Sequence, residues 1–300
     1  MKTLITGGGG FIGIWLTRRL LKAGVQVRIL DQRGPSEFAK SFLGDLLDEV
    51  EWVIGDVVQA WHVANAVRGC DSVVHLAAVL TPFCQENPIR GAEIIVIGTL
   101  NMFEAARLHG IKNVIYTSSA GVFGPSDGTY PNPTTHYGAF KLAVEGCARA
   151  YFEEQGINSV GFRPLLVYGP GRDAGGGKGP TLSCRAAAYG ESYNIPFTGI
   201  TDWIYVDDVV AAFESAITKP IKGAHAFNLI GEQTPIQDFV DIIKDIVPGA
   251  KVSCSGEALP VNAYLADNGA YDALGELPRT GVRDGIQQTI DYYIAMKKSS

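Results

Sequence analysis

Cysteine and histidine are both scarce in this 300-residue sequence, with five of each, and neither is clustered. The cysteines form no CxxC pair and stand far apart, at Cys70, Cys84, Cys147, Cys184 and Cys254. An odd, dispersed set of this kind is typical of reduced thiols that are buried as small apolar side chains in a cytoplasmic protein. No two histidines have the spacing of metal ligands, so the sequence predicts no metal site.

Long apolar runs and basic clusters are also missing. No stretch approaches the roughly 18 uncharged apolar residues that a membrane-spanning helix needs. Strand-like sequence begins almost directly after Met1, so we expect no signal peptide. The net charge is −6 at pH 7 and the Lys and Arg residues are scattered. We therefore expect a cytoplasmic protein with a small-molecule substrate and with no nucleic-acid or membrane partner.

What the sequence has is a globular composition, 46% apolar and 19% charged, and an alternation of short apolar runs with longer amphipathic segments. Strands are predicted at TLIT (3–6), QVRILD (26–31), VEWVIGDV (50–57), DSVVHLAA (71–78), NVIYTSS (113–119) and NSVGFRPLLV (158–167). Helices are predicted at 11–24, 59–69, 90–109 and 136–155. This alternation predicts an α/β fold with a doubly wound parallel sheet that is covered by helices on both faces.

The alternation fades after about residue 168, where the glycine-rich segment GPGRDAGGGKGP begins. We expect residues 1–168 to form a nucleotide-binding domain, with a returning segment around 203–230 in which AHAFNLI adds one more strand to the sheet. Residues 169–202 and 231–300 would then form a smaller C-terminal substrate-binding domain. The glycine-rich segment lacks the pattern of a triphosphate-binding loop, and it is interpreted as a loop over the substrate cleft.

Four consecutive glycines lie between the first predicted strand and the first predicted helix. Two registers fit: Gly7, Gly10 and Gly13 form GxxGxxG, whereas Gly8, Gly10 and Gly13 form GxGxxG. In either register an early glycine makes the tight turn, Gly10 lets a pyrophosphate approach the backbone, and Gly13 lets the helix pack on the strand. The helix N-terminus offers free N–H groups to the anion. The pattern predicts a Rossmann-type dinucleotide site.

The next predicted strand ends at Asp31, which lies 21 residues beyond Gly10. A carboxylate at this place can accept hydrogen bonds from the ribose hydroxyls of the adenosine, and it repels a 2′-phosphate. NAD is therefore favoured over NADP as the cofactor. Arg33 leaves NADP open, because its guanidinium could meet a 2′-phosphate.

A second candidate site contains Tyr137 and Lys141, which share one face of a predicted helix because they are four residues apart. A nearby ammonium favours the phenolate and lowers the pKa of the tyrosine, so that the phenol can exchange a proton with a secondary alcohol. Ser119 lies 18 residues before the tyrosine at a strand end and could hydrogen-bond the same oxygen. The second YxxxK pair, Tyr293 and Lys297, lies in the last predicted helix without such a serine, and we take it as coincidental.

In their order along the chain, TGGGGFIG, Asp31, GDV, HLAA, TSSAGVFG, YGAFK and RPLLVYGPG resemble the extended short-chain dehydrogenase/reductase superfamily, in its NAD-dependent epimerase/dehydratase group. The resemblance covers nearly the whole chain and weakens after residue 230. It implies that Ser119, Tyr137 and Lys141 are catalytic, and that a homodimer packs through the helices at 90–109 and 136–155. The residues that would bind the cofactor are Gly7, Gly10, Phe11, Ile12, Gly13, Asp31, Arg33, Asp56, Val57, Leu76, Ala77, Ala78, Tyr137, Lys141, Pro164 and Val167.

Two departures from this family concern the substrate. Sugar-nucleotide epimerases usually carry Asn at the position of Leu166, and they often carry Arg at the position of Thr201. Two polar anchors for a nucleotide diphosphate are therefore absent. An anionic ligand would need other cations, for which the candidates are Arg172, Lys178 and Arg185.

The function that these residues favour is an NAD-dependent oxidoreductase that acts on a secondary alcohol or ketone of a small carbohydrate-like or hydroxy/keto substrate. Tyr137 would be the general acid/base, Ser119 would position and polarise the oxygen, and Lys141 would lower the pKa of the tyrosine. The alternatives are a sugar-nucleotide epimerase or dehydratase, in which the hydride returns to the same substrate, and a non-catalytic NAD-binding sensor. Net accumulation of NADH separates the dehydrogenase from the epimerase.

Overall fold

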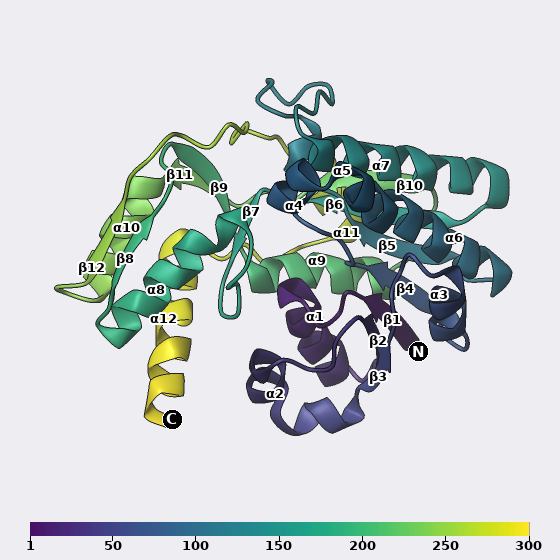
Figure 1. Ribbon diagram of the computed structural model, residues 1–300, viewed down its shortest axis with the longest axis horizontal. Coiled ribbons are helices and arrows are strands. Elements are labelled where there is room, and N and C mark those ends of the chain that lie inside the picture. Colours follow the sequence, from purple (N-terminus) through teal and green to yellow (C-terminus); the bar gives the residue numbers. More distant parts are fainter. Residues whose placement is uncertain (300) are drawn as a thin grey trace.

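A seven-stranded parallel sheet forms the centre of the larger lobe in the computed structural model, which describes residues 1–299 (Figure 1). Its strands, in spatial order, are β3 (Glu51–Ile54), β2 (Gln26–Asp31), β1 (Lys2–Thr6), β4 (Ser72–His75), β5 (Asn113–Thr117), β6 (Asn158–Arg163) and β10 (Ala224–Asn228). Every neighbouring pair is parallel. The strand order reverses between β1 and β4, and a crevice for a ligand is expected beyond the carboxyl ends of these strands.

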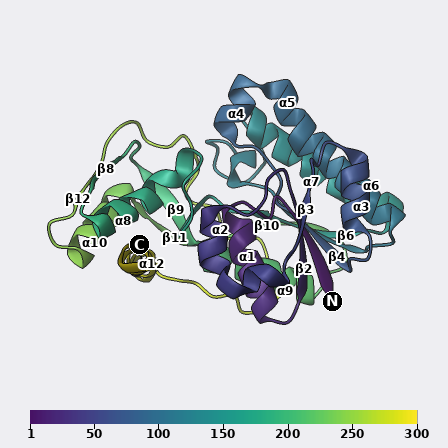
Figure 2. The same ribbon diagram turned by 60° about the horizontal axis from the view of Figure 1, so that its bottom comes forward.

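Helices cover both faces of this sheet (Figure 2). One face carries α1 (Phe11–Lys22), α2 (Glu37–Leu43), η1 (Gly44–Glu49) and α9 (Val206–Thr218). The other carries α3 (Ala60–Val67), α6 (Gly98–Leu108) and α7 (His136–Gln155). Successive residues of a strand point to opposite faces of the sheet and so belong to two different hydrophobic cores. Ile5 packs under α1, and Leu4 packs on the opposite face. The predicted doubly wound α/β fold is confirmed.

The predicted strand 158–167 is two strands in the structure, because Pro164 interrupts the β conformation. A proline has no N–H for a sheet ladder. β6 ends before it, and β7 (Leu166–Tyr168) joins a different sheet. The predicted helix 90–109 is likewise divided into α5 (Pro88–Ala92), the π-helical turn η2 (Glu93–Ile97) and α6. The short helices α2 and α4 (Thr81–Glu86) were not predicted, since each spans fewer than two full periods.

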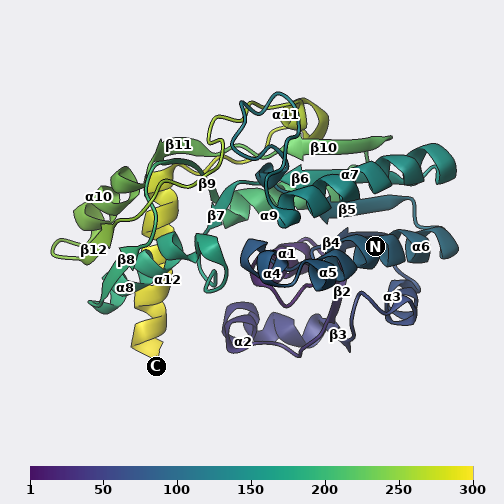
Figure 3. The same cartoon turned by 45° about the horizontal axis from the view of Figure 1, so that its top comes forward.

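The smaller lobe lies beside the large sheet, and β7, β9 (Ile200–Tyr205) and β11 (Glu232–Pro235) form a three-stranded sheet between the two (Figure 3). A parallel pair, β8 (Ser192–Ile195) and β12 (Lys251–Cys254), completes its strands. Its helical elements are η4 (Gly176–Lys178), α8 (Gly179–Tyr189), α10 (Ile236–Ile246) and α12 (Val282–Ser299). The short elements η3 (Ala120–Val122) and α11 (Ala270–Leu274) lie in connecting segments.

The core of the smaller lobe is aromatic. Trp203 is fully buried and stacks on Phe239 at 4.3 Å between ring centroids, while Tyr168 meets Phe239 edge-on. This core is continuous with the one under α1 and α9, so the two lobes share buried side chains. Among residues 1–299, no helix combines the length and the apolar character that crossing a bilayer requires.

Candidate active site

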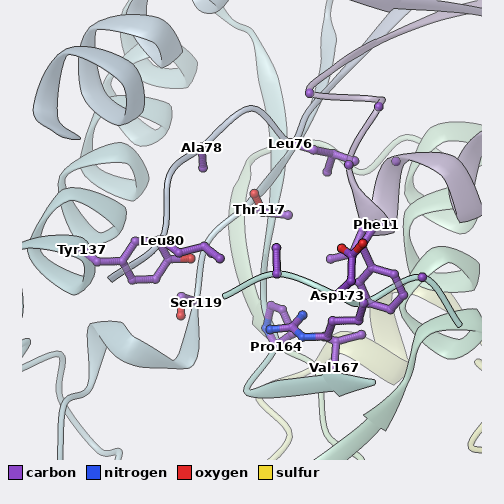
Figure 4. Close-up of a pocket in the computed structure, with 18 of the residues that line it drawn as sticks. Phe11, Leu76, Ala78, Leu80, Thr117, Ser119, Tyr137, Pro164, Val167 and Asp173 are labelled. Carbon is purple, nitrogen blue, oxygen red and sulfur yellow. The ribbon is translucent and has the colours of Figure 1, made fainter. Parts of the chain in front are cut away.

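Two adjoining cavities lie at the carboxyl ends of β1 and β4. The first, here the tyrosine cavity, has a volume of about 500 Å³ and extends from the glycine loop to Tyr137 and Ser119 (Figure 4). The second, here the Asp31 cavity, has a volume of about 450 Å³ and extends from the same loop to Asp31 and Val57. Both are lined by Gly7 and Gly10. Together they form one elongated crevice with an acidic end and a phenolic end.

The glycine loop is tight enough to exclude side chains. Gly7 has a φ of +65°, a left-handed conformation, and a Cβ at this position would lie 2.7 Å from the backbone of Ala77. A Cβ at Gly13 would lie 2.5 Å from the carbonyl oxygen of Gly8, so α1 packs directly on the loop. Because Gly7 makes the left-handed turn, the geometry favours the register of Gly7, Gly10 and Gly13.

The N-terminus of α1 is open to the crevice. Gly10 is its N-cap and provides no side-chain hydrogen bond, and the first turn holds no acidic residue. Gly10, Phe11 and Ile12 line the tyrosine cavity. The first N–H groups of a helix have no intrahelical acceptor and carry partial positive charge. These features fit the pyrophosphate of a dinucleotide.

Asp31 lies at the end of β2 and is held by backbone donors. Its Oδ2 accepts a hydrogen bond from the N–H of Gly9 at 3.0 Å, and its Oδ1 accepts one from the N–H of Arg33 at 3.3 Å. Trp52 fixes the same turn, because its Nε1 donates to the carbonyl oxygen of Arg33 at 2.8 Å. Asp31 and Arg33 both line the Asp31 cavity. The carboxylate lies at the end of β2, where the adenosine ribose of a dinucleotide is expected.

Most of the predicted cofactor residues line one cavity or both, but Asp56 lines neither. Its carboxylate accepts a hydrogen bond from Nη2 of Arg90 at 3.1 Å and another from the N–H of Val58 at 3.0 Å. Val57 does line the Asp31 cavity. The predicted residues on the cavity walls are Gly7, Gly10, Phe11, Ile12, Gly13, Asp31, Arg33, Val57, Leu76, Ala77, Ala78, Tyr137, Lys141, Pro164 and Val167.

The three predicted catalytic residues converge at the tyrosine cavity. Tyr137 and Lys141 lie on α7, which is capped by a hydrogen bond from the N–H of Gly138 to Oγ1 of Thr135 at 3.1 Å. Ser119 follows β5, and its Oγ accepts a hydrogen bond from the N–H of Gly121 at 3.0 Å. Figure 4 shows Tyr137 and Ser119 together on one side of the cavity, with Phe11 and Asp173 on the opposite side.

The expectation that Lys141 lowers the pKa of Tyr137 is wrong for this structure. Burial raises the pKa of the Tyr137 phenol, and a hydrogen bond with Ser119 and the guanidinium of Arg172 oppose the shift. Nζ of Lys141 donates to the carbonyl oxygen of Thr117 at 2.6 Å and lies 5.7 Å from the centroid of the tyrosine ring. The ammonium is therefore directed at the backbone of β5, and desolvation determines the direction of the shift.

Lys141 is itself buried, with 3% of its surface exposed. Burial lowers its pKa to about 8, while the nearby Cys84 and Glu145 oppose this shift. One turn further along α7, Glu145 forms a buried ion pair with Arg163 of β6. This pair anchors the helix to the sheet and so fixes the face of α7 that carries Tyr137 and Lys141.

Several cavity residues were not among those predicted, although Thr117, Leu165 and Gly55 lie in motifs that the sequence analysis quoted. These are Ser36, Phe38, Leu80, Thr117, Leu165, Asp173 and Ala174 in the tyrosine cavity, and Gln32, Gly55, Val79 and Ile94 in the Asp31 cavity. Of the three candidate cations, Arg172 lines the tyrosine cavity, whereas Lys178 and Arg185 line neither cavity. Leu166 and Thr201 are buried in the three-stranded sheet and do not reach the cavity.

This arrangement can hold a dinucleotide along its length and can move a proton at one end. The loop from Gly7 to Gly13 would hold the pyrophosphate, and Asp31 would hold the adenosine ribose. When bound, NAD supplies a hydride acceptor. Tyr137 can exchange a proton with a substrate oxygen, and Ser119 can donate a hydrogen bond to that oxygen.

Comparison with known proteins agrees with this geometry. Residues 3–229 match the NAD dependent epimerase/dehydratase family. The UDP-glucose 4-epimerase of Mycolicibacterium smegmatis is 30% identical to this chain, with 98% of each chain covered. The human 3 beta-hydroxysteroid dehydrogenase type 7 is 32% identical over 64% of this chain and 51% of its own length.

Solved structures show the same fold. The UDP-glucose 4-epimerase of Thermotoga maritima with UDP-glucose has a TM-score of 0.86 at 24% identity, over 100% of both chains. The UDP-glucose 4-epimerase of Thermus thermophilus in complex with NAD has a TM-score of 0.83 at 24% identity, over 98% of this chain and 99% of its own. The Rossmann-type architecture and the resemblance noted in the sequence are thereby confirmed. The chain belongs to the NAD dependent epimerase/dehydratase family and is an enzyme that uses NAD.

Proposed function

We propose that the protein is an NAD-dependent sugar-nucleotide epimerase, in which the hydride returns to the same substrate. The observation that carries this proposal is the single crevice that joins the glycine loop to Tyr137 and Ser119. The full-length similarity to a UDP-glucose 4-epimerase supports a sugar nucleotide as the substrate. This preference differs from the one drawn from the sequence alone, which favoured net oxidation of a smaller substrate.

In the proposed reaction, the substrate is a secondary alcohol of a sugar ring. Bound NAD would supply the acceptor for the hydride of the C–H bond. Tyr137 would accept the proton of the O–H bond once its own phenol has ionised, which its burial opposes, and a ketone would remain. Ser119 donates a hydrogen bond to the ketone oxygen. Tyr137 would give the proton back to the same oxygen when the hydride returns to the other face of the carbon, and this would yield the epimer.

The proposal is tested by supplying UDP-glucose to the NAD-loaded protein and following UDP-galactose by chromatography and NADH by absorbance. The expected result is interconversion of the two sugar nucleotides without net accumulation of NADH. Steady accumulation of NADH with aldonates, uronates or free sugars, and no conversion of any sugar nucleotide, would contradict it.

Net dehydrogenation is the second candidate function. Two observations favour it: neither Leu166 nor Thr201 offers the amide or guanidinium usual in sugar-nucleotide epimerases, and a steroid dehydrogenase is 32% identical over 64% of the chain. The same assay decides between the two, because only a dehydrogenase converts a full equivalent of free NAD for each substrate molecule.

We also propose a homodimer that packs through α6 and α7. Ala143, Gly146 and Ala150 are exposed on α7 at helical spacing, and Ile97 beside α6 is 43% exposed. Small residues allow two helices to approach closely, and a Cβ at Gly146 meets no atom within 4 Å in the chain. Gly146→Arg should therefore yield a monomer by light scattering, whereas Gln288→Arg, at an exposed position of α12, should not. A monomeric wild-type protein would exclude the dimer.

A further inference from the structure

The loop between β7 and η4 forms part of the wall of the tyrosine cavity. This segment, residues 169–175, is here called the strap. Gly171 rests on the ring of Phe38, and Gly175 rests on Leu80, so closely that a Cβ at either glycine would overlap the side chain. Phe38 belongs to α2 and Leu80 precedes α4, and both line the cavity. The strap is therefore supported from both sides and holds Arg172 at the cavity wall.

Arg172 has the donors of an anion site but no anionic partner. Its Nε donates to the carbonyl oxygen of Gly177 at 3.1 Å, and its guanidinium carbon lies 5.7 Å from the ring centroid of Phe11. Within residues 1–299 no carboxylate lies within 4.0 Å of it, and neither Nη group makes a hydrogen bond. Burial lowers its pKa to about 10, so the group is still a cation at neutral pH.

The other cation that lines the cavity is Lys141, and it already donates hydrogen bonds within the chain. Lys141 donates to both oxygens of Thr117, at 2.6 and 3.2 Å. A guanidinium offers its Nη donors in a planar fork that matches phosphate oxygens, and such charge-assisted bonds are stronger than neutral ones. Among the described residues, Arg172 is therefore the cavity cation whose two Nη groups are both without a partner.

Two anions could approach this guanidinium: the pyrophosphate of the cofactor and the diphosphate of a sugar nucleotide. The cofactor's anion has its own donors at the N-terminus of α1. Arg172 comes instead from the strap that leads into the smaller lobe, and its charge interacts with the phenol of Tyr137, where the substrate must react. Its place on the strap thus favours the substrate.

We propose that Arg172 is the substrate's anion anchor in this chain: its two Nη groups bind the diphosphate of the sugar nucleotide in place of the family's arginine, whose position is Thr201 here. This inference rests on the proposed function. Lys178 cannot take the role from its exposed position in η4, and Arg185 on α8 lies outside the cavity. Asp173 also lines the cavity, and its carboxylate works against an anion.

The test is isothermal titration of the NAD-loaded protein with UDP and, separately, with inorganic pyrophosphate. Arg172→Gln should weaken UDP binding about 10- to 100-fold, the range for losing charge-assisted hydrogen bonds. Arg172→Lys should recover part of the loss, because it restores a point charge without the fork. Lys178→Gln is the matched control and should bind UDP as the wild type does. Asp173→Asn should bind UDP more tightly.

Each outcome separates this inference from the proposed function. If Arg172→Gln, folded by its thermal unfolding curve, binds UDP as tightly as the wild type, the anchor is wrong and the sugar-nucleotide substrate stands. If the wild type binds pyrophosphate through Arg172 but not UDP, the anchor stands and the nucleotide is wrong. If the wild type binds neither ligand, both are wrong. If the variant loses NAD affinity as much as UDP affinity, Arg172 serves the cofactor and the proposal is overturned.

Discussion

The two lobes contribute residues to the candidate active site in different ways. In the larger lobe, the glycine loop, Asp31 and Ser119 lie at the ends of strands of one parallel sheet, and Tyr137 and Lys141 lie on a helix that packs on it, so regular secondary structure determines their places. In the smaller lobe, the core is a cluster of aromatic rings, and the contribution to the site comes through the strap. The difference fits the proposals that the sheet positions the reacting groups and that the strap selects the substrate.

The largest effect is expected in the larger lobe, from the removal of the phenolic oxygen of Tyr137. Tyr137→Phe should lower turnover roughly 100- to 10,000-fold, the usual contribution of a general acid/base. NAD affinity should be nearly unchanged, because the phenol lies at the opposite end of the crevice from Asp31. Steady-state kinetics and NAD titration measure the two effects. Undiminished turnover would remove Tyr137 from the mechanism.

Cofactor choice is the next largest effect. Asp31→Ala should weaken NAD binding about tenfold relative to NADP, because it removes an acceptor for the ribose hydroxyls and a charge that repels the 2′-phosphate. Part of the loss will come from the glycine loop, since the N–H of Gly9 loses its acceptor. Titration with both cofactors measures the ratio. A wild-type enzyme that already prefers NADP would show that Arg33 outweighs the carboxylate.

A buried carboxyl makes the smaller lobe sensitive to pH. Asp202 is 1% exposed; burial raises its pKa to about 7, and the N–H of Gly231 donates to it and opposes the shift. Because the folded pKa is above the unfolded one, the ionised carboxylate destabilises the fold above pH 7, and this cost disappears as the pH falls toward 4. Asp202→Asn should therefore melt higher than the wild type at pH 8, with a gap that closes near pH 4. A gap independent of pH would contradict the assignment.

The larger lobe should respond in the opposite direction, by a smaller amount. The pKa of Lys141 is lowered to about 8 from 10.5, so the cost of burying its charge is complete below pH 8 and vanishes as the pH rises toward 10.5. In the cofactor-free protein, Lys141→Met should melt higher than the wild type at pH 7, with a difference that shrinks above pH 8. A wild type that is more stable than this variant at pH 7 would mean that the bonds to Thr117 outweigh desolvation.

The comparison of the lobes also explains what the sequence could predict. The glycine loop, Asp31 and the Tyr137–Lys141 pair were found because their spacing repeats the geometry of strands and helices. The break at Pro164 was missed because the apolar run continues across it. The direction of the Tyr137 pKa shift was missed because it depends on burial and on the hydrogen bond from Lys141 to Thr117, which no spacing reports.

The substrate end was less predictable for a similar reason. Three cations were plausible anchors, and only their three-dimensional positions distinguish Arg172 from Lys178 and Arg185. The strap has no periodicity, and its course is determined by two contacts with segments distant in the sequence, at Phe38 and Leu80. The position of Arg172 at the cavity therefore depends on tertiary structure and not on a motif.

The strap has one consequence for the catalytic cycle. In the proposed epimerase reaction a free ketone has to be confined while the sugar ring turns over, and a strap that contacts Phe38 on one side and Leu80 on the other would confine it without domain closure. Loosening one support, by Leu80→Ala, should let the oxidised intermediate escape and leave reduced cofactor behind on the protein. If no reduced cofactor builds up during turnover of that variant, retention must come from elsewhere.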